Sequence, residues 1–501
     1  MTRAWTALVL VIGLVLPFVA KPVHVDDANF LRLAEGAAQD PWRPHDVLIN
    51  WQGTTERAFD VLSNPPGIAW WLAPVHSASE VLLHLWMWPW LALALWGCWR
   101  LGEVLVPSSA GGGRATLLVL GTAPVVLLSA QSLTPDLPLF ACTVAGVGGF
   151  LGARRHAWRW ALLAGFAFWF RYSGLCLVPL LLLAGWQRGR LREAAAVLVA
   201  PLLLVAHDLA AYGQVHAAAM VGFQAVSGTG TDLFRKAVAS LAMIGGAGLL
   251  PVLAWNSRAL EGLCFGLILG AGAAGLSGQV GLPLIMTLAS CAAGGIAFST
   301  LRPHSRDDLF LALWALGGLV FLLVLRFSAT RYWLPFLPAF AVAALRLAPS
   351  QRQLTLHVST TAALALALSI DDQALAHAHR EAAQRVAALS PSGSFAGHWG
   401  WQHYLEAAGW TPIEEEGPVT APFAVAEAPW PQAPDPQVCL EKVLEFELPD
   451  TWWGPRVHTA HGGANLHAYL VAGEPPTETY APWSFSNEPY ETVRVYGRCK
   501  E

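Results

Sequence analysis

Charged residues are scarce in this 501-residue chain. Asp, Glu, Lys and Arg make up 13% of it, and the mean hydropathy is +0.45, whereas soluble globular proteins carry about 25% charged residues. So little polar surface cannot coat a soluble body of this size. The composition therefore excludes a soluble enzyme, a disordered chain, a coiled coil and a nucleic-acid-binding protein, and predicts an α-helical polytopic membrane protein.

Lysine is the rarest of the charged residues, with four against 26 arginines. The charge is also divided along the chain. Residues 371–501 hold 18 of the 34 acidic and 7 of the 30 basic residues, a net charge of −11, whereas residues 1–370 have a net charge of +7. We therefore expect a basic membrane region, residues 1–370, followed by an acidic water-soluble domain, residues 371–501. The arginine bias fits a bacterial genome rich in G and C.

Cysteine is sparse as well. Five of the seven cysteines lie in apolar runs and fit small buried side chains. Cys439 and Cys499 lie in the acidic domain, where they can pair if that domain is exported to an oxidising compartment. Two free thiols fit the sequence equally well.

Long apolar runs are abundant, and a membrane-spanning helix needs about 20 apolar residues. Candidate spans are residues 4–20, 80–99, 115–132, 136–152, 193–212, 237–255, 258–276, 279–299, 308–326, 332–347 and 354–370. The run 157–187 lies between two arginine clusters, which the positive-inside rule keeps in the cytoplasm. It must therefore cross twice, as a short hairpin interrupted at Arg171. Thirteen crossings result, with the N-terminus cytoplasmic and residues 371–501 periplasmic or extracellular.

Five cations fall on short segments that this topology places outside the cell: Arg171, Arg235, Lys236, Arg326 and Arg331. Charges in such places are costly and often functional. Two interpretations remain open. The side chains either reach out to the membrane interface, or they form an anion site near the outer leaflet.

The predicted outer loop, residues 21–79, begins with two adjacent carboxylates, Asp26 and Asp27. Neighbouring side chains on a helix point about 100° apart, so the two cannot do the same work. One can act as a general base in a cavity while the other anchors the loop. An ordinary helix N-cap also fits the pair. Further along, Asn64-Pro65-Pro66-Gly67 predicts an extended turn before a Trp-rich run.

These features, in this order, resemble the GT-C glycosyltransferases of family 39, which include protein O-mannosyltransferases and lipid A aminoarabinose transferases. The remaining motifs of the resemblance are Thr134-Pro135-Asp136-Leu137-Pro138-Leu139, Arg331-Tyr332-Trp333-Leu334-Pro335-Phe336-Leu337-Pro338 and, in the acidic domain, His398-Trp399-Gly400-Trp401-Gln402-His403-Tyr404-Leu405. The usual family pair is Asp-Glu, so the Asp-Asp pair leaves the role of Asp27 less defined.

The resemblance implies a GT-C fold and a transferase in the bacterial inner membrane. Its donor would be a sugar on a polyprenyl phosphate, and its acceptor a hydroxyl of a lipid, a protein or a glycan at the outer face. Asp26 matches the family's base. Arg331, helped by Arg326, Arg171 or Lys236, would neutralise the departing phosphate. Asp136 would shape the sugar pocket or only cap its helix.

The resemblance names no certain cofactor and leaves a divalent metal open. His207-Asp208, with His216, fits either a satisfied polar pair at the membrane interface or, more weakly, a metal or phosphate site. The loose spacing of His458, His461 and His467 is a weak candidate for a metal site. Membrane lipids are expected partners, and nucleic acid is not.

Two other functions fit the same features. A transporter or lipid flippase also places cations and broken helices in the membrane, and a non-catalytic assembly subunit would tolerate changes at Asp26.

The acidic domain itself predicts a small α/β fold. We expect a helix over 374–389, a strand over 394–400, a helix over 401–408 and short strands near 443–448, 467–471 and 492–496. Proline-rich linkers are expected at 418–436 and 475–482.

Overall fold

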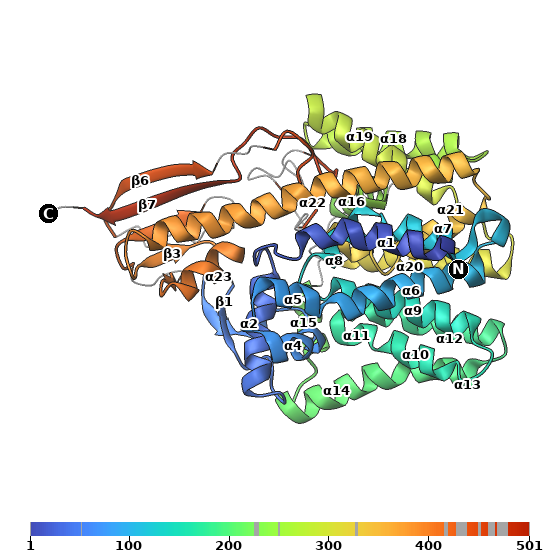
Figure 1. Cartoon of the computed structure of the whole chain (residues 1–501), viewed down its shortest axis with the longest axis horizontal. Helices are drawn as coiled ribbons and strands as arrows, with labels where there is room; N and C mark the ends of the chain where they lie inside the picture. Colours follow the sequence, from blue (N-terminus) through green and yellow to red (C-terminus); the bar gives the residue numbers. More distant parts are fainter. Residues whose placement is uncertain are drawn as a thin grey trace.

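The computed structural model describes residues 2–51, 53–224, 230–248, 251–325, 329–414, 419–426, 438–448, 452–458, 466–467 and 479–499. A body of helices fills most of the molecule, and a small sheet lies at one end of its long axis (Figure 1). The N-terminus lies at the end away from that sheet. The described residues therefore form a helical region and a small α/β region, as expected from the composition.

Six described helical segments are long and apolar enough to cross a membrane: Glu80–Leu105, Leu191–Tyr212, Ala259–Leu276, Gly281–Phe298, Arg306–Val324 and Gln351–Ala387. A pair bent by 72°, α7 (Gly112–Gly121) and α8 (Pro124–Ala130), makes a seventh if it is one span. Four shorter apolar segments are Trp5–Phe18, Asp136–Gly152, Tyr172–Gln187 and Leu337–Arg346. The chain is thus a multi-pass membrane protein. The count of thirteen crossings stays a prediction.

The run 157–187 is broken where the sequence predicted. Helices α10 (Trp158–Gly165) and α11 (Ala167–Phe170) end at Arg171, which is extended, and η4 (Tyr172–Cys176) leads into α12 (Leu177–Gln187). Gly174 makes the tight return, because a Cβ there would lie 2.5 Å from the backbone of Ala167. Because the helix ends at Arg171, its side chain can contact residues of neighbouring elements.

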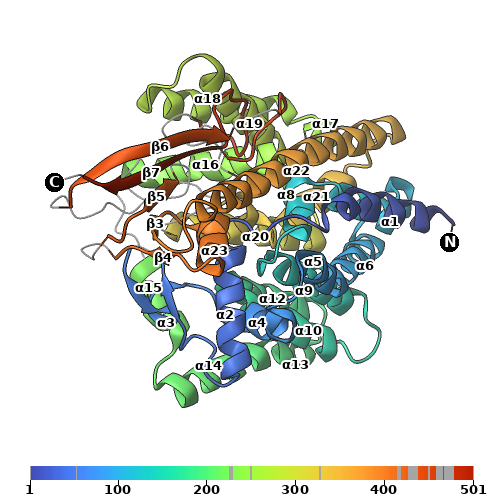
Figure 2. The ribbon, with the colours of Figure 1, turned by 60° about the vertical axis from the view of Figure 1, so that its left-hand side comes forward.

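The outer loop folds onto the protein. Its main helix is α2 (Asp27–Gln39), followed by the hairpin β1 (Leu48–Asn50) and β2 (Thr55–Arg57), then α3 (Ala58–Val61), α4 (Gly67–Leu72) and η2 (Ala73–Val75). Helix α2 packs against α4 and against α23 (Trp399–Ala407) of the acidic domain (Figure 2). Its Phe30 and Leu33 are buried inside the protein.

The remaining helices complete the membrane region. They are α1 (Thr2–Val15), η1 (Leu16–Phe18), α5 (Glu80–Trp86), α6 (Trp88–Leu105), η3 (Ser108–Ala110), α9 (Asp136–Gly152), α13 (Leu191–Ala194), η5 (Ala195–Leu198), α14 (Val199–Tyr212), α15 (His216–Gln224), α16 (Gly230–Gly248), α17 (Pro251–Ala254), α18 (Ala259–Leu276), α19 (Gly281–Phe298), α20 (Arg306–Val324), η6 (Thr330–Trp333) and α21 (Leu337–Arg346).

Helix α22 (Gln351–Ala387) joins the two regions without a break. The proposed domain boundary at residue 370 falls inside it, so a rigid element connects the membrane region to the sheet (Figure 1). The helix expected over 374–389 is the last part of α22.

The sheet has the order β4-β3-β5-β7-β6. Its strands are β3 (Ser394–Ala396), β4 (Thr411–Pro412), β5 (Phe423–Ala426), β6 (Leu440–Leu448) and β7 (Glu491–Arg498). Strand β3 runs parallel to β4 and β5, and β7 runs antiparallel to β5 and β6. The linker expected over 418–436 is interrupted, because β5 lies within it. Residues 418 and 427–436 of that range, and most of the strand expected over 467–471, lie outside the described residues. Cys439 and Cys499 form a disulfide.

Candidate active site

Four charged side chains from four separate elements meet beside the start of α2. Arg331 of η6 forms an ion pair with Asp26, and its Nε lies 3.6 Å from a carboxylate oxygen of Asp136 at the start of α9. The Nε of Arg171 lies 2.7 Å from the other oxygen of Asp136. The order Asp26–Arg331–Asp136–Arg171 alternates in sign, so each buried charge has an opposite neighbour.

Local backbone structure explains how each side chain reaches this cluster. Asp26 is the residue before α2, and its side chain does not cap that helix, so it is free to face Arg331. Asp136 follows Pro135 as the first residue of α9. Arg171 stands at the break in the 157–187 hairpin. The sequence selected all four residues, and the fold brings them together.

The four side chains differ in how far they are exposed to solvent. The side chain of Asp136 is 0% exposed and those of Arg331 and Arg171 are 9% and 10% exposed, whereas that of Asp26 is 21% exposed. An ionised carboxylate as deeply buried as Asp136 is tolerable because two guanidinium groups neutralise it. Asp26 is therefore the member of the cluster that is most accessible to an approaching molecule.

Asp27 points elsewhere. Its Oδ1 accepts a hydrogen bond from the backbone N–H of Leu133 at 2.8 Å, and the side chain is buried. Burial raises the pKa of the Asp27 carboxyl to about 7, because the charged form is poorly solvated there, although the nearby Lys21 and the bond from Leu133 oppose the shift. This contact ties α2 to the segment that precedes Asp136. The geometry thus favours an anchoring role for Asp27.

The other predicted cations lie differently. Lys236 of α16 is buried and donates to the carbonyl of Leu323 at 3.3 Å, near the end of α20. Arg326 lies outside the described residues. Tyr332 is a neighbour that the sequence reasoning did not assign a role, and its ring lies 4.8 Å below the guanidinium carbon of Arg171. Its position directly after Arg331 in the sequence is the feature from which a place near the cluster could have been predicted.

Comparisons with known proteins add likenesses of general layout. No model of a protein family matches the sequence, and no curated protein matches it. ArnT from Cupriavidus metallidurans bound to undecaprenyl phosphate is similar at 16% identity and a TM-score of 0.42, over 85% of this chain and 92% of that one. The apo state of that ArnT is similar at 15% identity and a TM-score of 0.43, over 88% of this chain and 95% of that one. The Archaeoglobus fulgidus oligosaccharyltransferase tethered with an acceptor peptide is similar at 13% identity and a TM-score of 0.45, over 82% of this chain and 63% of that one.

A second buried cluster includes Lys21 and His24, which precede Asp26 by a few residues in the sequence. The carboxylate of Asp372 in α22 accepts from Lys21 at 2.8 Å, and one of its oxygens lies 2.7 Å from His24 and 2.6 Å from His467. Sequence reasoning did not select Asp372. Its signal was the pair Asp371-Asp372 at the end of a long apolar run.

This second cluster bears on the open question of a metal. In the part of the chain that the structure describes, His24, Asp372 and His467 are the group whose ligand atoms all lie within 4.8 Å of one another. The ammonium of Lys21 already balances the charge of Asp372, and both side chains are 0% exposed. A divalent cation would leave this buried site with a net charge of +2, so the residues present fit an ion pair better than a metal. His461, from the spacing noted in the sequence, lies outside the described residues.

The weak candidate around His207 is a satisfied polar pair. Asp208 contacts His207 at 3.2 Å and accepts from the backbone N–H of His216 at 3.1 Å. Burial lowers the pKa of His216 to about 3, which keeps that imidazole neutral. These contacts fasten α14 to the start of α15.

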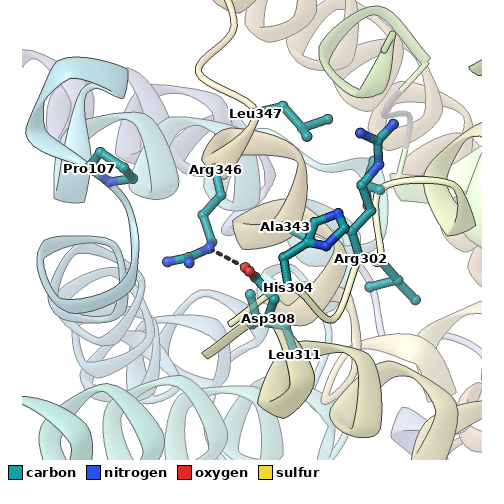
Figure 3. Close-up of a pocket in the computed structure, with 10 residues that line it drawn as sticks. Pro107, Arg302, His304, Asp308, Leu311, Ala343, Arg346 and Leu347 are labelled. Atoms are coloured by element: carbon teal, nitrogen blue, oxygen red, sulfur yellow. Dashed lines mark hydrogen bonds and ion pairs between the residues drawn. The ribbon is translucent and has the colours of Figure 1, made fainter. Parts of the chain in front are cut away.

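A cavity of about 230 Å³ lies between α20, α21 and the segment around Pro107 (Figure 3). Arg346 is bound there to Asp308 at 2.7 Å and to the carbonyl of Leu105 at 2.7 Å. Arg302 points away from Arg346 in Figure 3 and is bound to Asn256. None of the four clustered residues lines this cavity: Asp26, Asp136, Arg171 and Arg331.

Proposed function

We propose that the chain is a membrane glycosyltransferase that moves a sugar from a polyprenyl phosphate to an acceptor hydroxyl at the outer face of the membrane. The observation that carries the proposal is the Asp26–Arg331 pair. It joins a carboxylate and a guanidinium in one partly open cluster, and each belongs to a motif that resembles family 39. A base beside a phosphate-binding group is what this displacement needs.

The chemistry follows from that pair. The acceptor oxygen attacks the anomeric carbon, and the bond from that carbon to the phosphate oxygen breaks, usually with inversion. The electron pair leaves with the phosphate, whose growing charge Arg331 stabilises through its planar fork. Asp26 takes the proton of the acceptor hydroxyl.

The ion pair gives the donor a way to activate the base. Arg331 is bound to Asp26, the most exposed member of the cluster, and to the buried Asp136. An arriving phosphate competes with Asp26 for Arg331, because both are anions and Asp26 is the more exposed of the two carboxylates that contact Arg331. Binding of the donor would thereby release Asp26 to accept a proton, while Asp136 keeps Arg331 in place.

Asp136 and Arg171 then have a supporting task. Asp136 contacts both guanidinium groups and is fully buried, so it fixes their separation before any donor arrives. A preorganised cation site is more effective than one that must assemble around the phosphate. We assign Asp136 and Arg171 to holding the phosphate-binding site, and leave the identity of the sugar and the acceptor at the level of chemical class.

The experiment compares Asp26→Asn with Asp27→Asn in cells that lack the native gene, by mass spectrometry of lipid and glycan fractions. Loss of a general base typically costs about 10²–10⁴-fold in rate, so Asp26→Asn should nearly abolish the modified product. Asp27→Asn can still accept the Leu133 N–H bond and should keep most of the activity.

Protein amount in the membrane is measured for each variant as the control. A normal product level in Asp26→Asn would contradict the base assignment. A transporter or flippase would instead change only the side of the membrane on which a lipid appears, with no new glycosidic bond in the wild-type sample.

A further inference from the structure

The segment that carries Asp26 is short and is held by the acidic domain. Residues 21–26 make up most of the connection between η1 and α2, which runs from residue 19 to residue 26. The backbone N–H of Val23 donates to the hydroxyl of Tyr404 in α23 at 2.8 Å, and Lys21 and His24 both bind Asp372 in α22. These partners lie some 350 to 380 positions away in the sequence.

Asp372 is the centre of this attachment. Its two oxygens receive Lys21, His24 and His467, and all four side chains are buried. The rings of His24 and His467 also meet edge to face, with centroids 5.1 Å apart. One carboxylate therefore joins the segment before Asp26, the long connecting helix and the acidic domain.

Tyr404 makes a second attachment from the acidic domain. Its hydroxyl accepts from Val23 and donates to Glu80, which also binds Arg380 of α22 at 2.9 Å. Next to it, Gly400 allows α23 to approach closely, since a Cβ there would lie 2.4 Å from the carbonyl oxygen of Val23. The segment is thus gripped on its backbone as well as on its side chains.

The backbone between these attachments and Asp26 is strained. Val25 has a φ of +48°, in the left-handed region that a β-branched residue rarely adopts. Such a conformation persists only where the surroundings impose it. It lies between His24, which is fixed to Asp372, and Asp26, which faces Arg331, so the attachments on one side determine the direction of the side chain on the other.

From these contacts we infer that the acidic domain is part of the active site: Asp372 and Tyr404 are positioning residues that set the place of Asp26 opposite Arg331. The inference rests on the proposed function for its kinetic consequence, but not for its structural one. It gives the acidic domain a task in the proposed reaction. Loosening the domain's grip on residues 21–26 should slow the chemical step and leave donor binding by Arg331 largely intact.

The structural test is amide hydrogen exchange, followed by mass spectrometry, on the purified full-length protein. Tyr404→Phe removes one hydroxyl, and Asp372→Asn removes the charge that Lys21 and the histidines share. Both should speed exchange in the peptide covering residues 21–30 by about tenfold or more, because local opening becomes easier. Trp483→Phe is the matched control. It deletes another bond of the acidic domain, from the indole N–H to the carbonyl of Gly246 at 2.8 Å, and should leave this peptide unchanged.

The kinetic test separates positioning from general destabilisation. We expect Tyr404→Phe and Asp372→Asn to lower the rate of sugar transfer at saturating donor about tenfold or more, a loss set by misplacement of the reacting groups, with little change in the donor concentration at half-saturation. Asp372→Glu, which restores the charge on a longer side chain, should recover part of both the rate and the protection.

Unchanged exchange at residues 21–30 in both variants would overturn the inference. So would faster exchange in wild-type protein treated with a chelator and reversed by Zn²⁺, because a metal rather than Lys21 would then hold Asp372. If the wild-type protein transfers no sugar, the proposed function fails, while the exchange experiment still decides whether the acidic domain holds this segment.

Discussion

Asp26 and Asp27 are neighbours in the sequence but meet different partners. Asp26 is partly exposed and forms an ion pair with Arg331, whereas Asp27 is buried and bound to the backbone of Leu133. The sequence predicted such a division, because neighbouring side chains at a helix start diverge. Which of the two would be the open one came only from the resemblance to family 39.

Charge against the expected topology was the best guide to individual residues. Arg331 and Arg171 drew attention because they defy the positive-inside rule, and the structure places both against Asp136. Lys21 and Asp372 gave no such signal. Lys21 and Asp372 are 351 positions apart in the sequence, and no local pattern predicts that they bind each other.

Arg331 allows a test at the scale of a single residue. Arg331→Ala should weaken use of the lipid donor about 10–100-fold, since a hydrogen bond to a charged group contributes roughly 1.5–3 kcal/mol. Arg331→Lys should recover only part of this, because an ammonium lacks the planar fork that grips two oxygens. The measurement is the donor dependence of sugar transfer by purified protein in detergent.

The control is Arg43→Ala, which removes a half-exposed arginine of the outer loop, residues 21–79. It should leave the donor dependence as in the wild type. Unaltered donor use by Arg331→Ala would remove Arg331 from the phosphate site.

At the scale of elements, apolar runs predicted the long helices well, because a membrane-spanning helix needs many apolar residues in succession. Short strands were harder. Strand β5 has four residues directly after Pro422, in a stretch whose prolines favour a linker, and each strand of the β1–β2 hairpin has three. Such elements are stabilised by their neighbours in the sheet rather than by their own sequence.

A close contact between two glycines allows a test of how two helices pack together. Helices α18 and α19 touch at Gly262 and Gly295, where a Cβ on Gly295 would lie 2.0 Å from the carbonyl oxygen of Gly262. Gly295→Ala must push the helices apart and should cost about 1–3 kcal/mol of stability, as overpacking does. The measurement is the thermal unfolding midpoint in detergent.

Gly275→Ala on α18 is the matched control, because nothing lies within 4 Å of the added Cβ. It should leave the midpoint unchanged or raise it, since alanine favours a helix more than glycine does. Equal midpoints for Gly295→Ala and Gly275→Ala would show that the close contact does not stabilise the helix pair.

At the scale of the whole molecule, charge and covalent structure point to one orientation. The arginine-bearing α13 and the N-terminus lie at the end away from the sheet (Figure 1), as expected for the cytoplasmic side. At the other end, Cys439 and Cys499 are joined, which is typical of exported domains. The sequence alone left the pairing open, because two free thiols fitted it equally well. The fold brings the two residues together, since Cys439 directly precedes β6, Cys499 directly follows β7, and these strands pair.

We therefore predict that the C-terminal domain is exported and the N-terminus is cytoplasmic. Alkaline phosphatase fused after residue 501 should be active, because that enzyme needs the oxidising side of the membrane. In intact cells a membrane-impermeant maleimide should label Cys439 and Cys499 only after reduction. The Cys439→Ser/Cys499→Ser double variant should show no such reduction-dependent labelling. An inactive phosphatase fusion, together with thiols that the impermeant maleimide reaches only after the membrane is permeabilised, would place the acidic domain in the cytoplasm. Asp26, held through Tyr404 and Asp372 against that domain, would then lie on the same side, and the proposed reaction at the outer face would be excluded with it.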